Sequence, residues 1–229
     1  MSQAPWISKL LQLTDPALPI GAYAHSLGLE GLVQGGHILD AKELAIFLQR
    51  DVLASACDVD LPIIRLARQA LEQKDFTRLE DLDNLAWASR QSRELREASS
   101  KMGRQLVQLS ESLLYDDQRE FFLKTLDYLP RRQNLTVLAL YQTLHKIPLE
   151  PALSGYAWQM LSGFAQAGLK LLHLGPFGIQ KILTESLPHI APVVQKSLEI
   201  SQEEVGGFLP IWDISSSQHE YAPARLFIS

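Results

Sequence analysis

Apolar residues recur at helical spacing along most of the chain. After Asp40 they return every three or four positions, at Leu44, Phe47, Leu48 and Val52. This spacing places them on one face of an α-helix. Asp40 and Glu43 have the pattern of a capping box, in which the two side chains accept hydrogen bonds from backbone N–H groups of the first turn. A second helix is predicted to begin near Leu61-Pro62, because proline is tolerated in the first turn.

The longest predicted helix runs from about Leu79 to Tyr115. Its apolar residues fall near one face, and its other face carries oppositely charged residues four positions apart. Such pairs contribute only a few tenths of a kcal/mol each and are typical of a solvated face. Arg90–Glu94, Arg93–Glu97 and Glu97–Lys101 are the pairs. Small residues also interrupt the pattern and would allow a neighbouring helix to approach closely; they are Ala86, Ser89, Ser92, Ala98, Ser99 and Gly103.

Helical patterns return through the second half of the chain. They cover residues 120–128, 134–145, 151–174, 177–187 and 191–199. No stretch alternates over more than a few residues, so no sheet is predicted. The patterns indicate an all-α fold, a single domain over residues 1–229 built as a helical bundle of about eight to ten helices. The terminal segments, 1–36 and 206–229, are expected to be mostly irregular.

Residues 151–169 carry no charged side chain, and this length approaches that of a membrane span. The segment contains glutamines, serines and glycines, which favour a buried central helix of a globular protein instead. Lys170 follows at its end. It is expected either to extend its charge into water or to mark a functional surface.

Composition narrows the functional classes. The formal net charge of −5 argues against sequence-independent nucleic-acid binding, which needs a positive footprint. The single cysteine, Cys57, cannot form an internal disulfide and has no basic neighbour in sequence that would activate it. The N-terminal apolar run is too interrupted for a secretory signal. A cytoplasmic protein is therefore expected.

Motifs for chemistry are few. The acidic run Asp116, Asp117 and Glu120 resembles the magnesium motif of all-helical diphosphate enzymes, but no second acidic cluster of that form accompanies it. A magnesium-dependent enzyme using these residues is the alternative interpretation. A weaker alternative is nickel binding through histidine, since the spacing of the histidines does not demand a metal site. His25, His37 and His219 are the candidates for that reading.

Four blocks in sequence order carry a resemblance to the urease accessory protein F family. The first contains Leu18, Pro19, Gly21, Ser26, Gly28, Leu29 and Glu30. The second spans residues 88–106 with its Arg-Glu-Leu-Arg and Met-Gly elements, and the third spans residues 168–183. The fourth contains His219, Glu220, Arg225, Leu226, Phe227 and Ser229. The chain departs from the family at Pro176, at residues 221–224 and at Ile228.

The resemblance implies an all-helical, non-enzymatic homodimer without a cofactor. It further implies an adaptor role in urease maturation, in which the protein binds accessory protein D (also called H) and recruits the GTPase accessory protein G. The complex would act on apo-urease so that nickel is inserted. No nucleic-acid or membrane partner is implied.

The same resemblance assigns residues 1–36 and 206–229 to partner contacts. Glycine allows close backbone approach, which gives a reason for the five glycines between residues 18 and 36. Tyr23 and Arg225 are expected to share one hydrogen-bonded cluster, and Glu30 and Lys170 are candidates for the GTPase face. The full set of expected partner-binding residues is Gly21, Tyr23, His25, Ser26, Gly28, Glu30, Lys170, His219, Glu220 and Arg225.

Overall fold

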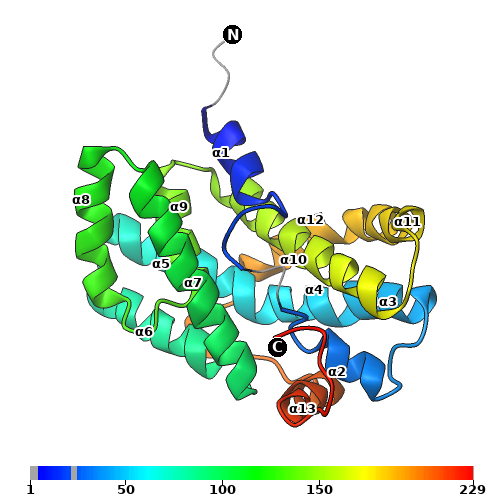
Figure 1. Ribbon diagram of the computed structural model, residues 1–229. Coiled ribbons are helices and arrows are strands. Elements are labelled where there is room, and N and C mark those ends of the chain that lie inside the picture. The colour runs from blue at the N-terminus through cyan, green and yellow to red at the C-terminus, as the bar shows by residue number, and fades with distance from the viewer. Residues whose placement is uncertain (1–4, 22–24, 229) are drawn as a thin grey trace.

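A computed structural model describes residues 5–21 and 25–228 of the chain. Over these residues the secondary structure is helical, with no strand, which confirms the all-α bundle. Figure 1 shows α10 (Leu149–Leu171) running through the middle of the molecule, while α1 (Pro5–Leu13) projects from one side. Within the described residues, no helix is both long enough and apolar enough to cross a membrane.

The two helices predicted around Asp40 and Leu61 form one continuous helical rod, about 50 Å long at 1.5 Å per residue. Two π-helical turns interrupt its α-helical hydrogen bonding without ending it. Such turns insert an extra residue and rotate the faces that follow. The segments are α3 (Ala41–Phe47), a π turn (Leu48–Val52), α4 (Leu53–Ser55), a second π turn (Ala56–Asp60) and α5 (Leu61–Gln73).

The start of the rod follows the predicted cap with one change. Asp40 accepts a hydrogen bond from the backbone N–H of Glu43 at 2.9 Å. The Glu43 carboxylate reaches back to the backbone N–H of Leu39, at 2.7 Å, and not to that of Asp40. Pro62 lies in the first turn of α5, as predicted.

The prediction of one helix from Leu79 to Tyr115 is wrong. The chain forms α6 (Phe76–Ala88) and α7 (Arg93–Leu113), with a break between them. Ser92 caps α7 by accepting a hydrogen bond from the backbone N–H of Leu95 at 3.2 Å. Arg96 donates to the backbone carbonyls of Arg90 and Gln91, which lie in the break between the two helices. The small polar residues that were predicted to allow close helix packing therefore lie at helix ends. Serine favours these positions because its hydroxyl forms hydrogen bonds with nearby backbone groups.

The remaining helices lie close to the predicted ranges. They are α8 (Asp116–Thr125), α9 (Asn134–Leu144), α11 (Pro176–Ser186) and α12 (Ile190–Ser197). Short 3₁₀ helices cover Leu126–Tyr128, Leu187–His189 and Gln202–Glu204. The tail is less irregular than expected, because α13 (Pro210–His219) occupies part of it. Its proline fits the first turn, and its buried face is short, which weakens the periodic signal.

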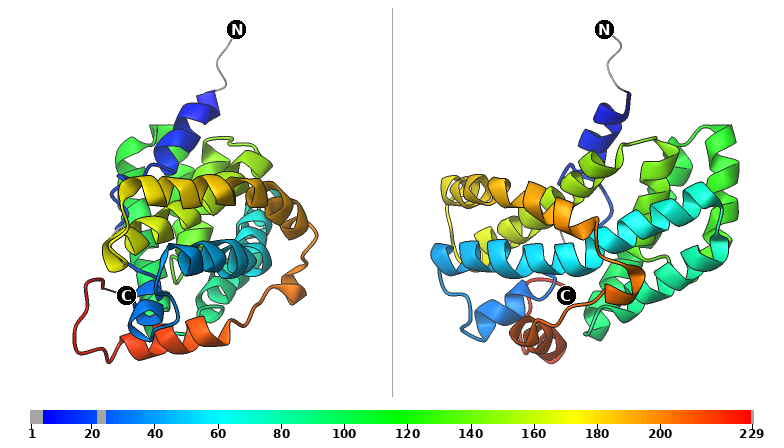
Figure 2. Two further views of the ribbon diagram at one scale, coloured as in Figure 1. Left: turned by 90° about the vertical axis from the view of Figure 1, so that its right-hand side faces the viewer. Right: turned by 180° about the vertical axis from the view of Figure 1, so that it is seen from behind.

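The two ends of the chain meet through α2 (Leu29–Gln34) and α13. Figures 1 and 2 show these helices side by side, on the far side of the rod from α1. A Cβ at Gly28 would lie 2.0 Å from Ser216 Oγ and 2.7 Å from Trp212 Nε1, and one at Gly31 would lie 2.4 Å from the Ser215 carbonyl oxygen. The glycines of the N-terminal segment thus permit close packing inside the molecule.

We expect Gly28→Ala to destabilise the fold by about 3 kcal/mol, because the added methyl overlaps α13 and φ is +91°. Gly21→Ala, with φ of +80° but open space around it, should cost about 1 kcal/mol. Gly163→Ala is the matched control: it lies within α10 in open space and should stabilise by about 0.5–1 kcal/mol. Urea denaturation of the three variants tests this order, and equal effects at Gly28 and Gly21 would contradict it.

Candidate functional site

A buried carboxylate joins the two ends of the chain. Glu30 lies in the first turn of α2 and is 3% exposed. Ser26 Oγ accepts a hydrogen bond from its backbone N–H at 3.3 Å, which fixes the start of the helix. The Glu30 carboxylate in turn accepts hydrogen bonds from the backbone N–H groups of Leu226 at 2.7 Å and Phe227 at 3.0 Å. Glu30 therefore binds the tail directly.

His219, at the end of α13, lies between two carboxylates. Its Nε2 is 3.0 Å from Glu30 Oε2, and its Nδ1 is 2.8 Å from Glu94 Oε2 on α7. The side chain is 1% exposed. Ionised carboxylates only accept hydrogen bonds, so with both of them ionised each ring nitrogen must donate. His219 thus bridges α2 and α7 through both of its ring nitrogens.

Arg225 completes this arrangement. Its Nη1 is 2.8 Å from the second oxygen of Glu94, so Glu94 binds both α13 and the tail. We call Glu30, Glu94, His219 and Arg225 the tail cluster. Nearby, Arg93 and Glu220 form a more exposed ion pair, of a kind that contributes little to stability.

Glu94 was the residue that sequence analysis missed. Its pairing with Arg90 at i,i+4 was interpreted as part of a solvated face, and that interpretation is wrong. Arg90 is instead 2.6 Å from buried Asp60, which also accepts a hydrogen bond from the Tyr156 hydroxyl at 3.0 Å. The neighbouring pair Arg93–Glu97 is exposed, as expected. The Arg-Glu-Leu-Arg block of the family resemblance contains Glu94, but only the fold shows which charged residue each member of the block pairs with.

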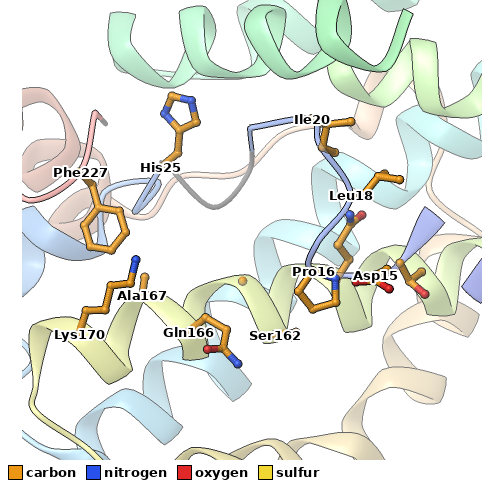
Figure 3. Close-up of a pocket in the computed structure, with 13 residues that line it drawn as sticks. Asp15, Pro16, Leu18, Ile20, His25, Ser162, Gln166, Ala167, Lys170 and Phe227 are labelled. Atoms are coloured by element: carbon orange, nitrogen blue, oxygen red, sulfur yellow. The ribbon is translucent and has the colours of Figure 1, made fainter. Parts of the chain in front are cut away.

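A pocket lies next to the tail cluster, between the N-terminal segment and α10. Figure 3 shows His25 on one side and Lys170 on the other, with the Lys170 ammonium group directed toward the ring of Phe227. The Lys170 Nζ is 5.3 Å from the centre of that ring, within the range of a cation–π contact. Burial, reinforced by Lys101, lowers the pKa of His25, although Glu94 opposes the shift. Two of the expected partner-binding residues, His25 and Lys170, thus line the same pocket as Phe227 of the tail.

The expected partner-binding residues divide by exposure. His25, Ser26, Glu30 and His219 are buried. Ser26 holds the start of α2, and Glu30 and His219 hold the tail. Gly28 packs on α13. Gly21 is exposed, Arg225 is 40% exposed, and Lys170 and Glu220 are half-buried. Tyr23 lies outside the described residues, so its pairing with Arg225 stays a prediction.

The tail carries exposed apolar side chains next to Arg225 in sequence. Tyr221 is 82% exposed and Leu226 63%, and Ile228 is also exposed. Ile211 and Ile214 are also exposed, on α13. Large apolar groups gathered on one surface mark sites of association. The buried charges thus hold a strip of apolar side chains toward solvent.

The residues proposed for metal chemistry do not converge in the part of the chain that the structure describes. No group of three or more histidine, cysteine or acidic side chains there could hold a metal ion. Glu120 is exposed and paired with Lys124 on α8, and Asp116 is exposed beside it. The side chain of Asp117 is not among those described. Neither Asp116 nor Glu120 lines the pocket between the N-terminal segment and α10.

The fold and the tail cluster define an all-α protein whose two ends together build one ordered surface. A family model described as UreF matches residues 38–187. A urease accessory protein UreF from Marinomonas sp. (strain MWYL1) is 33% identical over 221 residues, covering 96% of this chain and 93% of its own. That of Methylobacillus flagellatus is 28% identical over 229 residues, covering both chains completely. The chain belongs to the UreF family of urease accessory proteins.

Acid should release the tail. Burial raises the pKa of Glu30, but the hydrogen bonds from Leu226, His219 and Phe227 outweigh it and hold this pKa below its ordinary value of 4.5. The stability that Glu30 contributes is therefore present above about pH 4.5 and lost as the pH falls through the lowered pKa. Amide NMR signals of Leu226 and Phe227 should shift together in this range. A Glu30→Gln variant should lack the transition, and its persistence there would contradict the assignment.

His219→Ala should destabilise the protein by about 3 kcal/mol, because it removes the ring that bridges Glu30 and Glu94 and leaves the two carboxylates facing each other across the space that it filled. Thermal denaturation and protease cleavage within residues 220–228 measure the effect. His189→Ala, at an exposed histidine, is the control and should change stability by less than about 0.5 kcal/mol. Equal behaviour of the two variants would show that His219 does not hold the tail.

Proposed function

We propose that this chain is a non-enzymatic adaptor in urease maturation. It binds accessory protein D (also called H) and recruits the GTPase accessory protein G, so that nickel is inserted into apo-urease. Membership of the UreF family supports the pathway. The observation that carries the adaptor role is the tail cluster, in which buried charges from both ends of the chain fix an exposed apolar strip.

The accessory protein D partner is assigned to this strip. Tyr221, Leu226 and Ile228 supply apolar contact area, and Arg225 supplies a partly exposed guanidinium. Aromatic residues and arginine are favoured where binding energy concentrates in an interface. Because the strip is already ordered on the chain, less conformational entropy is lost on association.

One residue, Lys170, is the candidate for contact with the GTPase accessory protein G. Glu30 was a candidate for that contact, but its 3% exposure makes it a positioning residue. Lys170 remains the candidate, since it lies at the end of α10 beside the pocket and the tail. The proposal includes a homodimer that acts in the cytoplasm without a cofactor and without nucleic-acid or membrane partners.

Reconstituted urease activation tests the proposal. The mixture contains apo-urease, nickel, bicarbonate, GTP and the cognate accessory proteins, with and without this chain. We expect activation to depend on the chain. Activation that is indifferent to it, with partners shown to be competent, would contradict the adaptor role.

Variants locate the contact. Leu226→Asp should weaken binding to accessory protein D at least about tenfold, because it places a charge in an apolar contact, and tenfold corresponds to about 1.4 kcal/mol. Arg225→Ala should also weaken it, with helix content unchanged by circular dichroism. Leu123→Asp on α8, at a similarly exposed leucine, is the control and should bind normally. Unchanged affinity of Leu226→Asp would remove the tail strip from this interface.

A further inference from the structure

A second surface lies at the junction of α6 and α7. The indole of Trp87, near the end of α6, is half-buried and carries two guanidinium groups. That of Arg96 on α7 lies 4.9 Å from the ring centre, and that of Arg131, from the loop before α9, lies 4.8 Å from it. Both distances are within the range of cation–π contacts. Two like charges are thus held beside one ring.

The loop that presents Arg131 is fixed. Its backbone N–H groups at Arg131, Arg132 and Gln133 donate to the buried carboxylate of Asp83 at 2.7, 3.1 and 2.9 Å. The loop also crosses α7 at Gly103, where a Cβ would lie 1.9 Å from the Arg132 carbonyl oxygen. Arg132 adopts a left-handed φ of 48°, which is uncommon for a residue other than glycine. The chain therefore holds these arginines in a defined place.

The cations of this surface lack carboxylate partners. Arg104, next to Gly103, is exposed, as are Arg131 and Arg132. Among the residues that the structure describes, no carboxylate forms an ion pair with these three or with Arg96. Asp83, which lies beneath the loop, is directed at the loop backbone. This surface is therefore locally positive, although the chain as a whole has a formal net charge of −5.

We propose that Arg96, Arg104, Arg131 and Arg132 form a docking surface for a carboxylate-rich segment of a protein partner. The planar guanidinium matches a carboxylate through two parallel hydrogen bonds. Stacking on Trp87 orients two of these groups in advance, so fewer rotamers are lost on binding. The surface is distinct from the tail strip, and its use does not depend on the adaptor role.

A nucleic acid fits this surface less well. Single strands bind through bases that stack on aromatic rings, and the Trp87 ring already carries two guanidinium groups. Backbone binding by charge alone needs a positive footprint that releases many counterions, whereas this one contains four arginines in an acidic chain. Carboxylates on a protein segment match the charge of the surface and the planar geometry of its guanidinium groups.

Titration of the full chain with a peptide of alternating glutamate and serine tests the proposal. The indole N–H signal of Trp87 reports binding in the NMR spectrum. We expect saturable shifts that weaken as salt rises, and an affinity about tenfold lower for the double variant Arg131→Ala, Arg132→Ala. Arg119→Ala, at an exposed arginine on α8, is the matched control and should bind the peptide normally.

Arg131→Lys keeps the charge but removes the planar fork, so it should lose part of the affinity while circular dichroism and thermal denaturation stay unchanged. Three results would overturn the proposal: equal binding of a glutamine–serine peptide, full affinity in the double variant, or tighter binding of an oligonucleotide or a phosphopeptide than of the glutamate peptide. The last result would reassign the surface to phosphate.

Discussion

The arrangement of both ends of this protein depends on one buried carboxylate that can only accept hydrogen bonds. Glu30 needs donors once α2 is packed, and the tail supplies them through His219 and two backbone N–H groups. The close α2–α13 contact at Gly28 brings those donors within reach. Packing and polar satisfaction are therefore coupled, because a bulkier residue at Gly28 would separate Glu30 from its partners.

Because of this coupling, most of the groups that support the tail surface differ from the groups that a partner would contact. Glu30 and His219, which fix the tail, are buried, and the groups available to a partner are Arg225 and the exposed apolar side chains of the tail. A surface built in this way is specific because its shape follows from an internal network with few alternative arrangements. The loop at Arg131 follows the same rule, since a buried carboxylate, Asp83, holds backbone N–H groups while arginine side chains remain outside. In both places an internal acid orients an external surface.

Much of the fold could be predicted from the sequence, because most helices are amphipathic and their periodicity is local information. The break at Ser92 was missed because one serine reads equally well as a packing residue or as a cap. Of the candidate site, Glu30, His219 and Arg225 were identified through the family resemblance. Glu94 was not, because its local partner at i,i+4 concealed the distant one. Charge pairing across 125 positions is a property of the tertiary structure alone.

The hydrogen bond from the backbone N–H of Leu226 to Glu30 spans 196 positions in sequence. During synthesis, α2 leaves the ribosome long before its donors exist, so its acid must remain hydrated until translation has passed Phe227. A chain that ends just before Leu226 would lack both backbone donors to Glu30, so the surface that these hydrogen bonds order would not form.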